Sequence, residues 1–134
     1  MSAPMGRRWR VPRELLLVGA GAVPGALLRW WLQDPLVANL LGCLLFGLLM
    51  GPGAARPRLL LVGMVGFCGS LTTFSGWELQ LQQALQHGRP WNLLALLGGT
   101  LAGGLGALLL GMGLGRGLAA LGRQALKALR AGIG

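Results

Sequence analysis

Four long apolar runs, separated by short stretches rich in turn-forming residues, constrain the fold of this chain more than any other feature. A membrane-spanning helix needs roughly 20 apolar residues, and about 17 suffice in some proteins. The runs therefore predict an all-α membrane protein with four transmembrane helices, the second of them short, in a single domain over residues 1–134. The predicted spans are about residues 15–32, 36–51, 59–83 and 91–115.

The stretches between the runs have the composition of turns. They read QDP at residues 33–35, GPGAARPR at 51–58 and HGRP at 87–90, and Pro and Gly favour turns at helix ends. Most of the five tryptophans lie near the predicted span ends, which is where aromatic side chains meet the membrane surface.

The balance of apolar and charged residues argues against a soluble helical bundle. Hydrophobic residues make up 54% of the chain and charged residues 11%, with only three acidic residues, whereas soluble domains carry roughly 25% charged residues. The net charge of +9 does not indicate nucleic-acid binding, because the basic residues flank the apolar runs and do not form one face. Contact with anionic membrane lipid explains them better.

The N-terminal stretch RRWRVPRELLLVGAGAVPGA allows a second interpretation, because a basic region followed by an apolar run is also typical of a secretory signal peptide. Three more apolar runs follow, and Arg29 lies inside the same apolar stretch. A first transmembrane helix is the simpler interpretation.

Basic residues are distributed unevenly between the two ends of the predicted spans. Two of them, Arg29 and Arg89, belong to one side, and ten belong to the side of the two termini. Because segments rich in Lys and Arg stay in the cytoplasm, we expect a multi-pass protein of the cell (inner) membrane with both termini cytoplasmic. The ten residues are Arg7, Arg8, Arg10, Arg13, Arg56, Arg58, Arg116, Arg123, Lys127 and Arg130.

The C-terminal segment 116–130 combines basic and apolar residues at helical spacing. An apolar face is formed by Leu118, Leu121, Ala125 and Leu129, and the basic residues lie on the other face. This pattern is typical of an amphipathic helix that lies along the membrane interface.

Small residues recur every four positions in two of the spans, and this spacing lets helices approach closely within lipid. Because a charge in lipid is costly, the Arg29 that follows the first of these series should face protein or water. In the first span the small residues are Gly21 and Gly25, and Arg29 follows at the same spacing. In the fourth span they are Gly99, Gly103, Ala107, Gly111 and Gly115.

The sequence contains no pattern that indicates an enzyme. Cys43 and Cys68 lack metal-ligand spacing and are expected to be small packing residues, and His87 is expected to be solvated in a loop. No nucleophile is accompanied by a base that could activate it.

The stretch GFCGSLTTFSGWE, at residues 66–78, interrupts the third apolar run with glycines, hydroxyls and aromatic residues. In lipid, a helix break is tolerated only where it is buried in protein or lines a polar cavity. A broken helix exposes carbonyl groups that can bind a cation and N–H groups that can bind an anion. Phe74 and Trp77 would share one face, with ring edges of partial positive charge. A kinked packing helix is the alternative.

Three segments resemble the Fluc, or CrcB-type, fluoride channel family. GFCGSLTTFSGW resembles the family signature G-F-x-G-G-x-T-T-F-S-T-F. GAVPGALLRWWL resembles the family's first helix, and VANLLGCLLFGLL resembles its second helix, where Asn is followed three residues later by Gly. The resemblance extends over all four spans, although the fourth matches only in general character.

The resemblance implies an antiparallel dimer of four-helix subunits, with two fluoride pores and a structural sodium ion at the dimer centre. By motif position, backbone carbonyls of Gly69 and Thr72 would bind the sodium ion, and Arg29 would match the arginine of the first helix. The anion pathway would include Asn39, Thr73, Phe74, Ser75 and Trp77.

The chain departs from the family pattern at several positions. The second signature glycine is Ser70, and Gly76 and Trp77 replace the final Thr and Phe. Gln80 stands where the family often has Glu, and Thr100 is the only hydroxyl candidate in the fourth span.

The expected function is a fluoride channel subunit that lets cytoplasmic fluoride leave passively. One alternative is a small four-helix multidrug or cation exporter, which needs a carboxylate within the membrane, and another is a non-conducting assembly subunit. The partner is either a second copy of the chain or an oppositely oriented paralogue. The ratio of ten basic residues to two favours the paralogue, because one chain inserted in both orientations needs nearly balanced loop charges.

Overall fold

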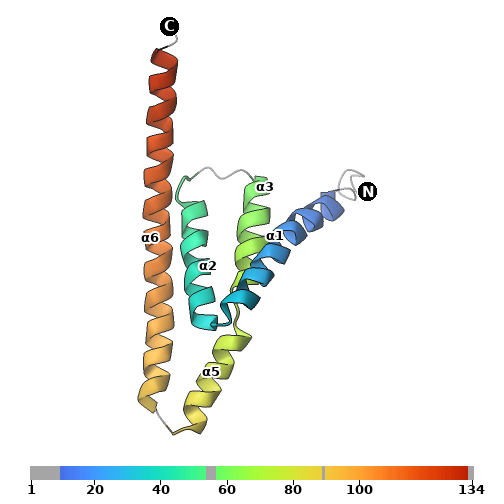
Figure 1. Cartoon of the computed structure of the whole chain (residues 1–134), viewed down its shortest axis with the longest axis vertical. Coiled ribbons are helices and arrows are strands. Elements are labelled where there is room, and N and C mark those ends of the chain that lie inside the picture. Colours follow the sequence, from blue (N-terminus) through green and yellow to red (C-terminus); the bar gives the residue numbers. More distant parts are fainter. Residues whose placement is uncertain (1–9, 54–56, 89, 133–134) are drawn as a thin grey trace, which may run out of the picture.

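The computed structural model of the chain describes residues 10–53, 57–88 and 90–132 and is all-helical over these ranges, which confirms the all-α part of the predicted fold class (Figure 1). The elements are α1 (Arg10–Leu32), α2 (Pro35–Met50), α3 (Pro57–Leu59), the π-helix η2 (Leu60–Cys68), α4 (Gly69–Leu71), α5 (Ser75–Gln86) and α6 (Pro90–Ala131).

Three stretches of these helices are long and apolar enough to cross a membrane: Arg13–Leu32, Pro57–Gln86 and Trp91–Ala131. The remaining apolar helix, α2, has 16 residues, which is below the usual length of a span. The second predicted span is therefore the short one, as the sequence indicates.

The connection between α1 and α2 is very tight. Gln33 has a left-handed backbone with φ of 55°, and the Asp34 carboxylate then accepts hydrogen bonds from the N–H groups of Leu36 and Val37 at 2.8 and 3.3 Å. With Pro35 in its first turn, α2 starts with a well-formed N-terminal cap. This turn brings the end of α1 next to the start of α2.

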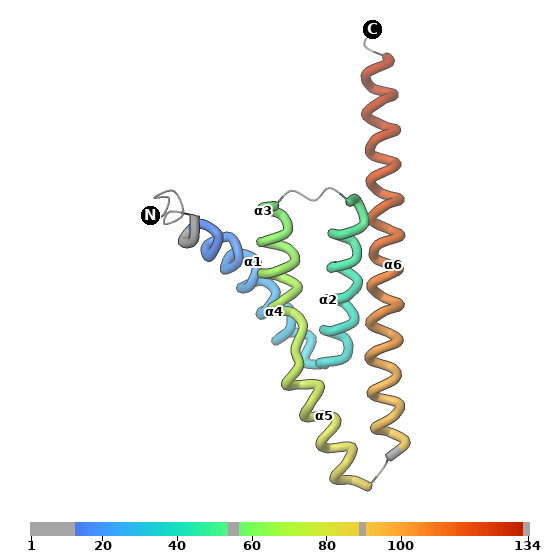
Figure 2. Tube along the Cα trace, turned by 180° about the vertical axis from the view of Figure 1, so that it is seen from behind, coloured from blue at the N-terminus to red at the C-terminus, as the bar shows by residue number. Residues whose placement is uncertain are grey.

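The helices pack as two main pairs, α2 against α6 and α1 against η2 (Figures 1 and 2). In the second pair, a Cβ atom added at Gly21 would overlap the Val62 carbonyl, and one added at Gly66 would overlap the Val18 carbonyl. Glycine therefore lets these two backbones touch, as small residues do at helix contacts in membranes.

The pair α2 and α6 also packs through glycine. Cβ atoms added at Gly111 and Gly115 would overlap the backbone of α2, and one added at Gly47 would overlap the backbone of α6. Gly103 lies against an α2 side chain. At Gly99, an added Cβ would meet no atom of the described residues within 4 Å. The contact seam thus covers the later members of the predicted series and does not reach Gly99.

The third apolar run folds into several consecutive elements. η2 has the wider i to i+5 pattern of a π-helix over nine residues. This pattern is rare, and its single-turn form is frequent at functional sites. α4 ends at Leu71, Thr72 has extended dihedral angles of φ −72° and ψ 150°, and α5 begins at Ser75. Figure 2 shows the short extended segment between α4 and α5.

The helix α6 differs from the sequence-based expectation. It is one helix of 42 residues, so the segment 116–130 continues the helix of the fourth span without a break. The segment 116–130 is rich in Ala, Leu, Arg, Gln and Lys, which favour helix, and it contains no proline. At a rise of 1.5 Å per residue, α6 is about 63 Å long, whereas the hydrocarbon core of a bilayer is about 30 Å thick.

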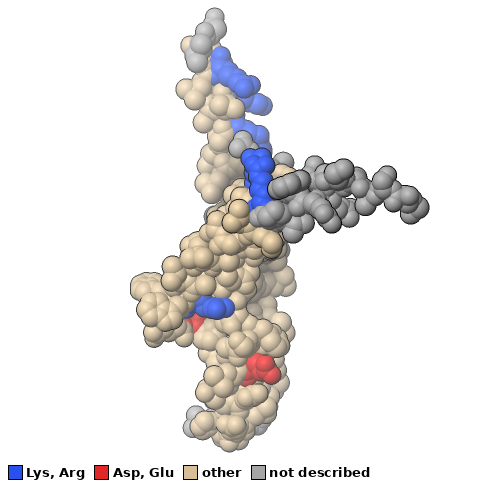
Figure 3. Space-filling model, turned by 90° about the vertical axis from the view of Figure 1, so that its right-hand side faces the viewer, with Lys and Arg blue, Asp and Glu red and all other residues tan. Residues whose placement is uncertain are grey.

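The described basic residues lie mostly at one end of the molecule. The start of α1, the end of α2, the start of α3 and the end of α6 lie toward this end (Figure 1), and Figure 3 shows most Lys and Arg side chains there. Arg29 lies at the opposite end of α1. Outside the described residues are Arg7, Arg8, Arg56 and Arg89, and the side chain of Arg10 is not described either.

Very little of the chain is buried. Among the described residues, the buried hydrophobic side chains are Ala38, Cys68 and Leu71, and no polar or charged residue is buried. Cys43 is half-buried, and both cysteines are free thiols, in line with a packing role. The chain exposes many large apolar side chains, which need lipid or another subunit to cover them.

Candidate functional site

The side chain of Asn39, on α2, binds both backbone groups of Thr73 in the segment between α4 and α5. The Thr73 N–H donates to Asn39 Oδ1 at 2.7 Å, and Asn39 Nδ2 donates to the Thr73 carbonyl at 3.0 Å. In a continuous α-helix, this N–H would donate to the carbonyl of Gly69. Asn39 therefore stabilises the extended segment. It also accepts the Thr73 N–H that would donate to the Gly69 carbonyl in a continuous helix.

Hydroxyl groups satisfy the carbonyls at the end of the preceding helix. Thr72 directs both its N–H and its Oγ1 to the Cys68 carbonyl, each at 3.1 Å. Ser70 Oγ donates to the Phe67 carbonyl, also at 3.1 Å. The last carbonyls of a helix often lack intrahelical partners, and these two hydroxyls supply additional donors to carbonyls in this region.

The start of α5 is organised by Thr73 and Ser75. Thr73 Oγ1 accepts a hydrogen bond from the Gly76 N–H at 3.4 Å and lies 3.3 Å from Ser75 Oγ. The first N–H groups of α5 point toward the extended segment, where the helix dipole carries partial positive charge. This end of α5 can therefore attract an anion.

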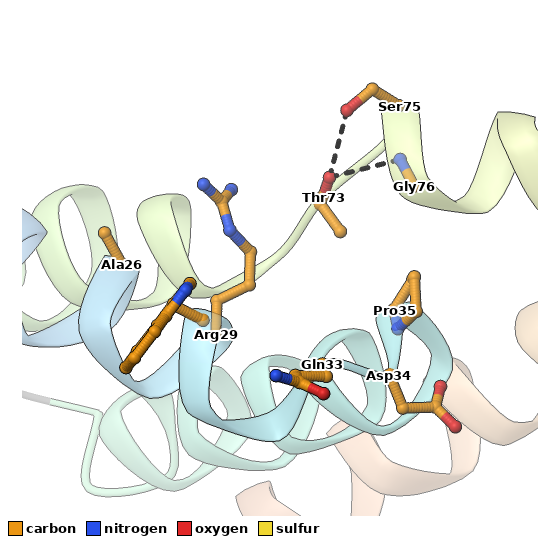
Figure 4. Close-up of a pocket in the computed structure, with 9 residues that line it drawn as sticks. Ala26, Arg29, Gln33, Asp34, Pro35, Thr73, Ser75 and Gly76 are labelled. Atoms are coloured by element: carbon orange, nitrogen blue, oxygen red, sulfur yellow. Dashed lines mark hydrogen bonds between the residues drawn. The ribbon is translucent and has the colours of Figure 1, made fainter.

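A cavity of about 490 Å³ opens beside this segment, between the end of α1, the start of α2 and the start of α5 (Figure 4). Arg29 is exposed on its wall and extends from α1 toward the extended segment. Arg29 thus faces a polar cavity, as the cost of a charge in lipid requires. The lining residues are Ala26, Arg29, Trp30, Gln33, Asp34, Pro35, Thr73, Ser75 and Gly76.

A second cavity, of about 270 Å³, lies between α2, η2 and α6 and is mainly apolar. It is lined by Gly69 and Thr72, together with Gly42, Cys43, Phe46, Met64, Cys68 and Leu108. The two cavities share no lining residue. The structure therefore separates the two residues expected to bind a cation from Thr73 and Ser75, which are expected on the anion pathway.

Phe74 and Trp77 form an aromatic pair beyond the extended segment. Their ring centroids are 5.4 Å apart with planes tilted by 51°, and the Phe74 side chain is 72% exposed. This is a geometry that aromatic pairs favour. The phenyl ring is thus accessible from outside the single chain, while the indole is half-buried.

The indole of Trp77 also joins α5 to α6. Its Nε1–H donates to Thr100 Oγ1 at 3.1 Å, and Thr100 Oγ1 donates its own proton to the Leu96 carbonyl at 2.7 Å. The indole N–H is therefore already bound within the chain. Sequence reasoning singled out both residues but missed their contact, which the lone hydroxyl of the fourth span could have suggested.

Gln80 stands out among the polar side chains of α5. Its Oε1 atom is buried and has no hydrogen-bond partner within the described ranges. Buried polar atoms are nearly always paired, so this carbonyl oxygen is an acceptor that the single described chain leaves open.

The described residues contain no group of three or more His, Cys, Asp or Glu side chains that could hold a metal ion. All three carboxylates of the chain, Glu14, Asp34 and Glu78, are exposed. A hard cation prefers oxygen ligands, so backbone carbonyls such as that of Gly69 are the ligands that this chain offers near the segment.

Comparison with known proteins gives consistent matches over the spans. The sequence profile of the family described as "CrcB-like protein, Camphor Resistance (CrcB)" matches residues 16–112. The "Fluoride-specific ion channel FluC 2" of Synechococcus sp. (strain CC9605) is 55% identical over 108 residues, which cover 77% of this chain and 81% of the relative.

Two relatives come from one organism, Synechococcus sp. (strain CC9902). Its "Fluoride-specific ion channel FluC 2" is 50% identical over 109 residues, covering 78% of this chain and 81% of the relative. Its "Fluoride-specific ion channel FluC 1" is 38% identical over 117 residues, covering 76% of this chain and 93% of the relative. These matches confirm the resemblance read from the three sequence segments, and the chain belongs to the CrcB-like family.

Proposed function

We propose that this chain is a subunit of a fluoride-selective channel that lets cytoplasmic fluoride leave the cell passively. The observation that carries the proposal is the segment Thr72–Phe74, which interrupts the third membrane-spanning run, bears the family signature and is held open by Asn39. The relatives bear the name of a fluoride-specific ion channel, and this is an ion-transport function and not an enzymatic one.

The proposed anion pathway passes along the start of α5. An amide nitrogen of Asn carries two hydrogens, and only one of those on Asn39 Nδ2 is used for the Thr73 carbonyl. The second hydrogen, the hydroxyls of Thr73 and Ser75 and the ring edges of Phe74 and Trp77 would replace the water around fluoride. The guanidinium of Arg29 would attract the anion into the adjoining cavity.

The proposed cation site uses the backbone carbonyls of Gly69 and Thr72. Both residues fit this role, because Asn39 takes the N–H that would otherwise occupy the Gly69 carbonyl, and Thr72 has an extended backbone that turns its carbonyl out of the helix. A sodium ion bound there would neutralise the partial negative charge of these carbonyls and add a structural contact at the centre of the assembly.

The proposed assembly is an antiparallel dimer in the cell (inner) membrane. The very small core, the exposed Phe74 ring and the open acceptor of Gln80 are surfaces that a second subunit would complete. In the proposed topology, ten basic residues lie on the side of the termini and two on the opposite side. Because this imbalance disfavours insertion of the same chain in both orientations, we favour a related chain of opposite orientation as the partner. The presence of a FluC 1 and a FluC 2 relative in one Synechococcus strain supports the idea of a second, related chain as the partner.

The main alternative, a small exporter, is less well supported. Coupling to protons in the membrane requires an embedded carboxylate, whereas Glu14 lies at the very start of its span and Asp34 caps α2 between two spans. Glu78 is the one carboxylate placed well inside a span, in the last third of Pro57–Gln86. The second alternative is a non-conducting assembly subunit. It predicts that the purified chain releases no fluoride from liposomes, and the efflux experiment below tests this.

The decisive experiment measures fluoride release from liposomes that contain the purified protein. The chain is reconstituted alone, and together with a FluC 1 relative from the same organism, and efflux is followed with a fluoride electrode. Fluoride release well above chloride release in either preparation supports the proposal. Folded protein without fluoride release in both preparations would refute it and favour the assembly subunit.

A further inference from the structure

The last third of α6 extends beyond the helix that it packs against. α2 ends at Met50, and the backbone of α6 at Gly115 and Arg116 still lies close to Gly51. Beyond Gly115, α6 continues to Ala131, and nearly all residues from 116 to 132 are exposed. We call residues 116–131 the C-terminal extension.

The extension carries its charges in one narrow stripe. At 3.6 residues per turn, its four basic residues fall within an arc of about 60°. Residues 116–134 contain no acidic residue, so the stripe has no counter-charge within the extension. Figure 3 shows Lys and Arg side chains along this part of the molecule. The stripe consists of Arg116, Arg123, Lys127 and Arg130.

The opposite face of the extension is apolar and continues a face of the membrane span. Leu118, Leu121 and Leu129 are exposed by 62%, 62% and 64%. Leu114 and Leu110, about one and two turns before Leu118 on the same side of α6, are exposed by 57% and 66%. An apolar surface thus leads without interruption from the span into the extension.

Glycine is concentrated where α6 leaves α2, at residues 111, 113, 115 and 117. Gly111 and Gly115 are required for packing, because an added Cβ would overlap the backbone of α2. An added Cβ at Gly113 or Gly117 would meet no atom within 4 Å in the described part of the chain. Packing therefore does not explain these two glycines, which weaken the helix at this point.

We propose that the C-terminal extension binds the surface of the membrane in which the chain is embedded, through anionic lipid headgroups. The basic stripe contacts lipid phosphates, the leucine face enters the interface, and α6 bends at Gly113–Gly117 to allow this. An amphipathic helix of this kind binds through both its apolar area and its positive charge. The proposal requires that the chain spans a membrane, but it does not depend on the ion that the chain conducts.

Charge complementarity favours lipid over a second copy of the chain. Pairing two extensions through their leucine faces would leave both basic stripes without any acidic residue to balance them, because the extension contains none. Anionic headgroups provide that balance, and they lie next to the point where α6 leaves the hydrocarbon core.

The test uses the full chain with a fluorescent probe on the leucine face. In a Cys43→Ala/Cys68→Ala background, Leu121→Cys is labelled with an environment-sensitive dye, and Gln124→Cys on the flank is the matched position. Each protein is reconstituted in phosphatidylcholine alone or with a quarter of phosphatidylglycerol. We expect the probe at position 121 to shift to the blue in the anionic bilayer, with about a twofold gain in quenching by nitroxide lipids. The flank position should change less.

Two further variants separate the contributions of charge and bending. Arg123→Gln/Lys127→Gln/Arg130→Gln should abolish the dependence on anionic lipid. Gly113→Ala/Gly117→Ala should stiffen α6 where it leaves α2 and reduce the blue shift of the probe at position 121. Gly106→Ala is the control, because an added Cβ there also meets no described atom within 4 Å, and it should leave the blue shift unchanged.

Two outcomes would overturn the proposal. A probe at position 121 that stays in water in both bilayers would mean that the extension stands free. A probe that is shielded equally in both bilayers, with self-quenching that unlabelled protein dilutes away, would mean that a second copy covers the leucine face.

Discussion

The side-chain amide of Asn39 binds the N–H and the carbonyl of Thr73, 34 positions along the chain, through hydrogen bonds of 2.7 and 3.0 Å. One side chain thus replaces the helical partners of a residue that lies in the break between α4 and α5. The pair also joins α2 to the third membrane-spanning run. This arrangement predicts that Asn39 contributes both to the shape of the site and to the passage of the anion.

The first prediction is that Asn39→Asp greatly reduces fluoride flux. Aspartate keeps an acceptor for the Thr73 N–H but loses the donor to the Thr73 carbonyl, and its negative charge repels an anion in a medium of low dielectric constant. We expect at least about a tenfold loss of flux, because repulsion of only 1.4 kcal/mol corresponds to that factor. Liposome efflux measures it, and Asn92→Asp, at an exposed position in the first turn of α6, is the control. Unchanged efflux in Asn39→Asp would show that Asn39 does not line the path.

The second prediction is that Phe74→Ile reduces flux while the protein still folds. The side chain is 72% exposed, so its removal costs little packing within the chain, but it removes a ring edge of positive character. Efflux and size-exclusion profiles are compared with those of Leu79→Ile, which alters another exposed side chain of α5. If Phe74→Ile conducts as well as Leu79→Ile, the aromatic edge is not required.

The third prediction concerns the hydrogen bond from Trp77 to Thr100. Thr100→Val keeps the shape but removes the acceptor of the indole N–H, which should destabilise the protein by about 1 kcal/mol and lower flux by misplacing the ring. Thr100→Ser should restore both properties. The loss caused by Thr100→Val should disappear in a Trp77→Phe background, because Phe has no N–H to place. An equal loss in both backgrounds would assign Thr100 a role that is independent of Trp77.

The sequence allowed much of the fold to be predicted, because hydropathy reports where a helix can contact lipid. It also indicated the position of the extended segment, since Gly69, Thr72 and Thr73 weaken a helix and offer hydroxyls to its backbone. The π-helix over Leu60–Cys68 could not be predicted, because a change from i+4 to i+5 hydrogen bonding leaves no mark in hydropathy. The clamp of Asn39 on Thr73 depends on tertiary packing between distant segments. The continuity of α6 was missed because the change in polarity after Gly115 was interpreted as the end of a helix.

The fourth prediction is that sodium stabilises the assembled protein. Binding of an ion to the folded state alone raises stability by about 2.7 kcal/mol at 100 times its dissociation constant. Thermal unfolding is measured in detergent with sodium chloride and with N-methyl-D-glucamine chloride at equal ionic strength. We expect a higher melting temperature in sodium, and potassium chloride serves as the control for a general salt effect. Identical melting in all three salts would argue against a sodium site at the carbonyls of Gly69 and Thr72.

The fifth prediction concerns orientation, and it follows from the charge count. Ten basic residues lie on the side of the termini and two on the opposite side, so nearly every copy should insert with both termini in the cytoplasm. An antiparallel pore would then need a partner with the opposite bias, and this chain alone should form few pores. A reporter fused to the C-terminus, read from both sides of the membrane, measures orientation, and liposome efflux measures conduction of the same protein.

A charge-neutralised variant is the sharpest control for this prediction. Replacing Arg116, Arg123, Lys127 and Arg130 by Gln removes four of the ten basic residues without touching the site, because all four are exposed and none of them lines either cavity. This variant should insert in mixed orientations, and flux from the single chain should rise if antiparallel pairing limits conduction. Mixed orientation together with full flux from the unmodified chain would instead mean that it pairs with its own inverted copies, and that the charge bias orients it only weakly.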